Sequence, residues 1–134
     1  MPFPVDEKYI LAAEEKLGVT FPSGFRIKMM ADNGGTVEAP ADEEIWDLYP
    51  FFDTSDKKRV KRTCNDIVRE TASAKEWTGF PANAVAIGAN GCGDRLVLLA
   101  NVDGSVLQDE VFCWDHETGD LDKVADDFAE LESV

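Results

Sequence analysis

The sequence predicts an α+β fold in which a mostly antiparallel sheet is packed by about four helices, in the order ααββαβββα. Three patterns indicate this fold: helical spacing of apolar residues near the amino terminus, branched and aromatic residues around Trp46, and three apolar stretches separated by turns after Pro81. The chain has 134 residues, of which 44% are apolar, and this is enough for one continuous core. We therefore expect a single domain over residues 1–134.

Two short helices are expected first. Asp6 is placed to cap a helix whose apolar residues keep helical spacing up to a left-handed exit at Gly18. Ser23 is placed to cap a second helix, which the Asn-Gly-Gly sequence at 33–35 ends.

A pair of antiparallel strands and the longest helix follow. Branched and aromatic residues at 36–38 and 45–51 predict the strands, with an acidic turn from Asp42 to Glu44 between them. Residues 56–77 keep helical periodicity and predict one long helix. A helix dipole disfavours bases in the first turns by a few tenths to about 1 kcal/mol each. We expect the bases found there to offset the surrounding acids; they are Lys57, Lys58, Arg59, Lys61 and Arg62.

The remaining residues predict a meander and a final helix. Apolar stretches at 84–88, 95–101 and 106–114 are expected to pair, and Asp103-Gly104 predicts a tight type I′ hairpin between the last two. An apolar stripe from about Asp122 onward predicts the final helix.

The cysteines and the amino terminus indicate the compartment. Cys64, Cys92 and Cys113 are an odd number of widely spaced thiols, which favours a reducing environment. The first residues lack the basic and apolar regions of a signal peptide, and no apolar run approaches the length of a membrane span. We expect a cytoplasmic protein.

Charge is distributed unevenly along the chain. The net charge of −14 divides into −6 for residues 1–50, +2 for 51–100 and −10 for 101–134. Such an anionic surface repels nucleic acid and anionic membranes and attracts a basic protein. We expect a protein partner, with neither nucleic acid nor membrane as a ligand.

Short motifs along nearly the whole chain resemble the SUKH superfamily (SMI1/KNR4-like), over roughly residues 6 to 132. Each motif is a turn or a cap, and the resemblance depends on their order and spacing. They are Leu17-Gly18, Phe21-Pro22, Asn33-Gly34-Gly35, Ile87-Gly88, Gly91-Cys92-Gly93-Asp94 and Trp114-Asp115-His116-Glu117-Thr118-Gly119.

This superfamily groups fungal cell-wall-synthesis regulators with bacterial immunity proteins. The resemblance implies an α+β sheet packed by helices and a binding module without catalytic residues. In bacteria many such proteins neutralise toxins, often nucleases, from competing cells. The basic start of the 56–77 helix and Cys92 depart from the family pattern, so the identity of the partner does not carry over.

Catalytic and cofactor chemistry finds little support in the residues. His116 is the only histidine and sits at a turn, where a structural role is expected, and the Gly-x-Ser-x-Gly turn of a hydrolase is absent. Cys113 and His116 have a zinc-like spacing that Cys92 or Cys64 could complete, but these ligands come from separate elements. The glycine-rich segment 88–93 lacks the Lys-Ser/Thr of a phosphate loop. We expect no enzyme activity, no metal and no cofactor.

A partner-binding surface is expected among acidic and aromatic residues. Most aromatic residues have core spacing, but one or two could be exposed anchors, and we expect Trp46 and Tyr49 to fill this role. The predicted partner-binding residues are Trp46, Asp47, Tyr49, Asp94, Asp103, Asp109, Glu110 and Glu117.

The sequence thus predicts an immunity protein, a monomer or weak homodimer that caps a basic toxin domain by acidic contacts. A regulatory scaffold that binds a host protein without any toxin is the alternative. A small metal-dependent enzyme using Asp94, Cys92 and His116 is a third possibility.

Overall fold

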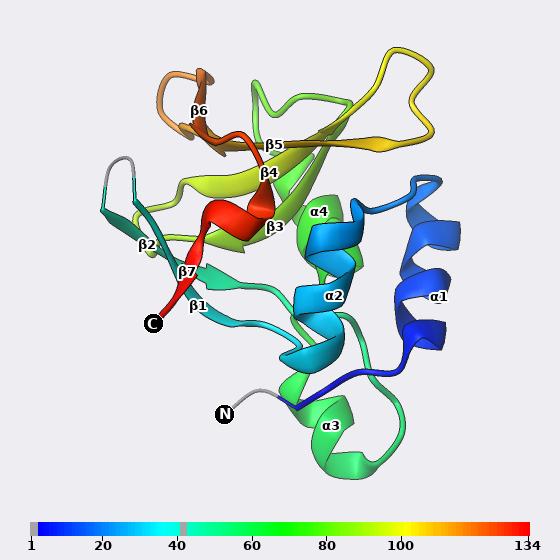
Figure 1. Cartoon of the computed structure of the whole chain (residues 1–134). Coiled ribbons are helices and arrows are strands. Elements are labelled where there is room, and N and C mark those ends of the chain that lie inside the picture. Colours follow the sequence, from blue (N-terminus) through cyan, green and yellow to red (C-terminus); the bar gives the residue numbers. More distant parts are fainter. Residues whose placement is uncertain (1–2, 41–42) are drawn as a thin grey trace.

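The computed structural model describes residues 3–40 and 43–134, and it shows an α+β fold built on a curled, antiparallel seven-stranded sheet (Figure 1). The strands lie in the order β6-β5-β4-β3-β2-β1-β7 across the sheet. They are β1 (Gly35–Ala39), β2 (Glu44–Leu48), β3 (Ala84–Ala89), β4 (Arg95–Ala100), β5 (Leu107–Trp114), β6 (Leu121–Ala125) and β7 (Glu132–Ser133). The helices are α1 (Glu7–Leu17), α2 (Ser23–Ala31), α3 (Lys57–Arg62) and α4 (Ile67–Ala74), with a 3-10 turn, η1 (Phe128–Glu130).

The two helices expected at the amino terminus are present. The Asp6 carboxylate accepts a hydrogen bond from the Lys8 N–H at 3.0 Å, and Gly18 ends α1 with a φ of 72°. The expected Ser23 cap is wrong by one residue, because Pro22 precedes the first turn and no side chain caps α2. Within the described residues, none of the helices has the length and apolar character needed to cross a membrane.

The single helix expected over 56–77 is two short helices. The Thr63 hydroxyl donates to the Arg59 carbonyl at 2.8 Å and accepts from the Asp53 N–H, which ends α3. Asp66 then accepts from the Arg69 N–H at 3.1 Å and begins α4. The apolar periodicity continues across this break, so periodicity alone does not reveal it.

The final helix expected from about Asp122 is wrong. Residues 121–125 form β6, which pairs with β5 so that Leu121 lies opposite Trp114 and Ala125 opposite Val111. A capping box between Asp127 and Glu130 then closes η1. The predicted order, with one long third helix and a final helix, is therefore not matched, whereas the α+β class and the antiparallel sheet are confirmed.

The meander of β3, β4 and β5 is confirmed, but the tight hairpin at Asp103-Gly104 is not. A type I′ turn needs a positive φ at both of its central residues. Gly104 has a φ of 79°, but Asp103 does not have a positive φ, since within 3–40 and 43–134 Glu43 is the non-glycine residue that does. The connection is a longer loop because Ser105 and Leu107 bond to the backbone of Thr20. Asp42, expected in the acidic turn before β2, lies outside the described residues.

The two faces of the sheet carry different cores. Helices α1, α2 and α4 cover one face (Figure 1), where the rings of Phe21, Phe25, Phe51 and Phe128 meet with centroids 4.8 to 5.9 Å apart. The other face carries a smaller apolar cluster around Trp114, against which Phe80 packs. The segment after α4 therefore crosses the outer face.

A buried asparagine connects α2 to the sheet. The Asn33 amide donates to the Phe51 carbonyl at 2.9 Å and accepts from the Phe51 N–H at 2.8 Å. Both backbone groups are thereby satisfied at a buried site, where Phe51 is 0% and Asn33 6% exposed. The Asn33 side chain thereby fixes the start of the segment that joins β2 to α3, and the Thr63 hydroxyl holds the same segment at Asp53.

We expect Asn33→Ala to lower the free energy of unfolding by about 2 to 4 kcal/mol, because it leaves two buried backbone groups without partners. Urea unfolding followed by circular dichroism measures the loss. Asn65→Ala, at an exposed asparagine, should change stability by less than about 0.5 kcal/mol. A loss below about 1 kcal/mol for the Asn33 variant would mean that water or a neighbour replaces the amide.

Candidate protein-binding surface

Two turns meet at one end of the sheet and join through a histidine and an aspartate. The β3–β4 loop carries Asp94, and the β5–β6 turn carries His116. The Asp94 carboxylate lies 2.7 Å from His116 Nδ1 and accepts the His116 backbone N–H at 3.2 Å. Asn90 donates from the same loop to Asp94 and to Glu44 at the start of β2. This network links β2, β3, β4 and β5 at one edge.

The close approach of the two turns requires a glycine. Gly93 has a φ of 103°, and a Cβ at this position would lie 2.9 Å from the His116 ring. The imidazole therefore packs directly on the backbone of the β3–β4 loop. This contact gives Gly93 a structural reason, whereas Gly91 meets no neighbour and is favoured by its positive φ of 83°.

The ionisation of Asp94 reflects the same contacts. Partial burial alone would raise its pKa, but hydrogen bonds from the His116 side chain and backbone and from Asn90 hold the pKa of Asp94 below its ordinary value. The carboxylate is thus charged at neutral pH, and its charge stabilises the junction of the two turns.

Trp77 projects from this end of the sheet. It follows α4, and 46% of its surface is exposed. Its ring meets the Trp114 and His116 rings edge to face, with centroids 6.5 and 5.8 Å away, and the Arg95 guanidinium lies 5.9 Å from its centre. The Trp114 Nε1 donates to the Gly79 carbonyl at 3.2 Å and anchors the segment behind it.

Trp77 is therefore an ordered aromatic side chain with nearly half of its surface in solvent. Tryptophans of this kind are enriched at the energetic centres of protein interfaces, because they bury a large area at little entropic cost. The neighbouring charges are mostly negative, with Arg95 as the base among them. The acids are Asp47, Asp94, Asp115, Glu117 and Asp120, and with Trp77 they define what we call the acidic end.

The structure brings three of the predicted partner-binding residues into the acidic end. Asp94 and Glu117 lie on the two joined turns, and Glu117 is 80% exposed. Asp47 is exposed on β2, opposite Ala89, which in turn lies opposite Arg95. These three carboxylates come from separate parts of the sequence, and the sheet places them at one edge.

Three other predicted residues lie elsewhere. Asp103 is in the β4–β5 loop and Asp109 near the start of β5, at the opposite end of a strand about 23 Å long. Glu110 is half-buried on β5, and its charge helps to raise the pKa of Lys123. The main cause of that shift is Asp126, whose Oδ1 lies 2.6 Å from Lys123 Nζ. The predicted residues therefore do not form one continuous surface.

The expected exposure of Trp46 and Tyr49 is wrong. Trp46 is 0% exposed and Tyr49 is 9% exposed, and both belong to the core. Side chains alternate along β2, so Trp46 and Leu48 face the helices while Ile45 and Asp47 face solvent. Burial also raises the pKa of the Tyr49 hydroxyl. Partner contact for the other predicted residues stays a prediction.

Trp77 is the residue that sequence reasoning missed as an anchor. Its spacing, like that of most aromatic residues in the chain, predicts a core position, although it lies after the last apolar position of its helix and immediately before Thr78-Gly79. A tryptophan at a helix exit has no helical neighbours to bury it. Its position at the helix exit is the feature of the sequence that indicates an exposed side chain.

The zinc set considered from sequence is not assembled among residues 3–40 and 43–134. Cys64 and Cys92 are exposed, and the group there that could hold a metal is Asp94, Asp115 and His116, without a cysteine. Its oxygen atoms already serve the fold, because Asp115 accepts the N–H groups of Glu117 and Thr118. The arrangement is that of two capped turns.

Comparison with known proteins gives one match. The family model described as SMI1 / KNR4 family (SUKH-1) matches residues 4–133, nearly the whole chain. No curated protein and no solved structure gives a significant match.

Replacing Asp94 should reveal its charge in the pH dependence of stability. Its folded pKa lies below the unfolded value of about 3.9, so the stabilisation is complete above that pH and is lost as pH falls through the folded pKa. We expect Asp94→Asn to cost about 0.5 to 1 kcal/mol at neutral pH, since solvent screens part of the charge, and progressively less below about pH 4. Urea unfolding at a series of pH values measures the difference.

Asp120→Asn, at an exposed carboxylate of the same end, is the control and should change stability by less than about 0.5 kcal/mol throughout. A difference between wild type and Asp94→Asn that grows toward acid pH would contradict the assigned role of the carboxylate.

Proposed function

The chain belongs to the SMI1/KNR4 (SUKH-1) family, and on this basis we propose that it is a non-catalytic binding module of the immunity type, which neutralises a basic, nuclease-type toxin domain. The observation that carries the proposal is Trp77, ordered and half exposed, among the carboxylates of the acidic end. The proposed interface combines an aromatic anchor with a negative rim.

This arrangement suits a cationic partner for two physical reasons. Nucleases need basic clefts to hold phosphates, and a group of carboxylates can occupy such a cleft in place of the nucleic acid. The net charge of −14 also accelerates encounter with a basic protein. Trp77 then supplies apolar area that charge pairs alone do not provide.

The single histidine joins the two turns of the acidic end, and the proposal gives it a structural role. His116 has its Nδ1 engaged by Asp94, its ring on Gly93 and one edge against Trp77. A histidine held in this way acts as part of the scaffold. The exposed free thiols of Cys64 and Cys92 support a reducing compartment such as the cytoplasm, where a toxin would act.

A regulatory scaffold is the second candidate, because the family joins regulators with immunity proteins. It would use the same acidic end to bind a host protein. The presence or absence of a toxin gene beside the gene for this protein distinguishes the two functions, as does the protein captured from the native host.

Capture from native lysate at low and high salt, followed by mass spectrometry, tests the function. We expect a basic toxin domain that is retained at low or moderate salt and released at high salt. Recovery of an unrelated housekeeping protein would favour the scaffold.

Binding measurements with that domain then test the surface. We expect Trp77→Ala to weaken affinity by about 30-fold, and Glu117→Gln with Asp120→Asn to slow association and flatten its salt dependence. Asp103→Asn with Asp109→Asn removes the same charge at the far end of β5 and should change affinity less than about threefold. Thermal unfolding confirms that each variant is folded. If the far pair weakens binding more than Trp77→Ala does, the acidic end is not the interface.

A further inference from the structure

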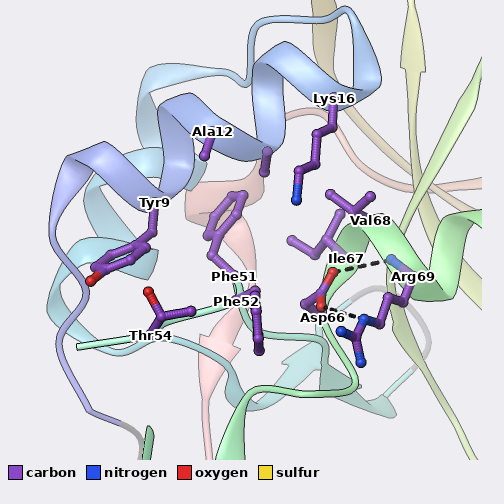
Figure 2. Close-up of a pocket in the computed structure, with 11 residues that line it drawn as sticks. Tyr9, Ala12, Lys16, Phe51, Phe52, Thr54, Asp66, Ile67, Val68 and Arg69 are labelled. Atoms are coloured by element: carbon purple, nitrogen blue, oxygen red, sulfur yellow. Dashed lines mark hydrogen bonds and ion pairs between the residues drawn. The ribbon is translucent and has the colours of Figure 1, made fainter. Parts of the chain in front are cut away.

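A groove between α1 and α4 opens on a different part of the molecule from the acidic end (Figure 2). It encloses about 340 Å³. Apolar side chains form most of its walls: Tyr9 and Ala12 come from α1, Phe52 from the segment after β2, and Val68 from α4. The volume is sufficient for one or two apolar side chains of a ligand.

The acid within the groove is already compensated. Asp66 is 3% exposed, caps α4 through the Arg69 N–H and lies 3.5 Å from Arg69 Nε. The Arg69 guanidinium packs over the Phe52 ring at 5.1 Å, while 62% of its side chain stays in solvent. Arg69 therefore satisfies Asp66 and still presents N–H groups at the rim.

One lysine, Lys16, stands on the opposite wall. Figure 2 shows Lys16 reaching from α1 toward Val68 on α4. Lys8, one turn from Ala12, lies over the Tyr9 ring at 5.2 Å. Both lysines are exposed. Cations thus border the apolar groove from both helices.

The groove continues toward α3. Thr54 lines both the groove and a neighbouring hollow formed with Lys57, Val60, Lys61 and Asp56. The Asp56 carboxylate is paired with Arg59 at 2.9 Å.

Helix α3 has no buried residue, and three of its bases, Lys58, Arg59 and Arg62, lie over the Phe3 ring, which leaves Lys57 and Lys61 on the side of the hollow. Lys57 and Lys58 stand in its first turn, where the helix dipole disfavours a base by a few tenths to about 1 kcal/mol, whereas Arg59, Lys61 and Arg62 lie in its last turn, where the dipole favours them.

We propose that the α1–α4 groove and the adjoining face of α3 bind an acidic segment of a partner protein that carries an apolar anchor residue. The groove takes the anchor, and Lys16, Arg69 and Lys61 pair with carboxylates beside it. This inference does not depend on the proposed function, since the groove is bordered by cations rather than carboxylates and lies on a different surface from the acidic end.

Charge and shape favour a protein segment over a nucleic acid. The net charge of −14 repels a polyanion as a whole, so attraction is confined to about 8 Å from the basic face at physiological salt. A short acidic segment fits within this range, and an extended nucleic-acid backbone does not. The apolar walls also require a side chain to fill them.

The test uses a fluorescein-labelled peptide of glutamate and aspartate with two central leucines, and fluorescence polarisation on the whole chain. A second peptide, with alanines in place of the leucines, removes the anchor. We expect the first to bind, the second to bind at least about fivefold more weakly, and both to weaken as salt rises. A single-stranded oligonucleotide of similar charge should bind more weakly than either.

Variants identify the surface. We expect Lys16→Gln with Lys61→Gln to weaken peptide binding at least about fivefold, and Lys16→Arg with Lys61→Arg to retain it. Ala12→Phe, at an exposed position of α1, should fill the groove and abolish the advantage of the leucine peptide. Lys75→Gln with Lys123→Gln changes the net charge equally at positions outside the groove and should have less than about a twofold effect.

The inference is overturned if the leucine peptide fails to bind tighter than about 1 mM, if the matched lysine pair weakens binding as much, or if the oligonucleotide binds better. The affinity of the double variant Lys16→Gln with Lys61→Gln for the toxin domain separates the two surfaces. This affinity should stay unchanged in the variant, although peptide binding is weakened.

Discussion

The two hydrogen bonds between the Asn33 amide and the Phe51 backbone are the interaction on which the rest of the structure depends. They fix the chain where it leaves β2, and they bring the Phe51 ring against Phe21 and Phe25. The next bond in the same segment, from the Ile67 N–H to the Pro50 carbonyl at 2.9 Å, sets the start of α4. The packing of helices on the sheet, and the wall of the groove between α1 and α4, follow from this short segment.

The sheet separates two surfaces of opposite charge. The acidic end collects carboxylates from β2, from the β3–β4 loop and from the β5–β6 turn, around Trp77. The α1–α4 groove and α3 collect cations around apolar walls. A molecule of this kind has a charge asymmetry as well as a large net charge, and the asymmetry orients an approaching charged partner before contact. The two proposed interfaces would therefore favour partners of opposite charge.

The differences between expectation and structure have local and long-range causes. The 56–77 helix breaks because Thr63 and Asp66 use their side chains to end one helix and cap another, and apolar periodicity does not register such bonds. The helix expected after Asp122 is a strand because the free edge of β5 is available to pair with it. Helical and strand patterns are hard to separate in so short a segment, and tertiary pairing decides between them.

By itself the sequence determined the fold class, the first two helices, the β3–β5 meander, the family and the excess of acid in the last third, because caps, glycines, periodicity and composition are properties of neighbouring residues. Only the tertiary structure decided which aromatic residue faces solvent and which carboxylates lie together. Trp46 is buried because its strand lies in the middle of the sheet under the helices, whereas Trp77 stays exposed at a helix exit. Asp94 and Glu117 both lie beside His116 because two turns distant in sequence close on this residue, and Asp103 is excluded by the length of β5. Such contacts depend on strand pairing and curl, which no local pattern encodes.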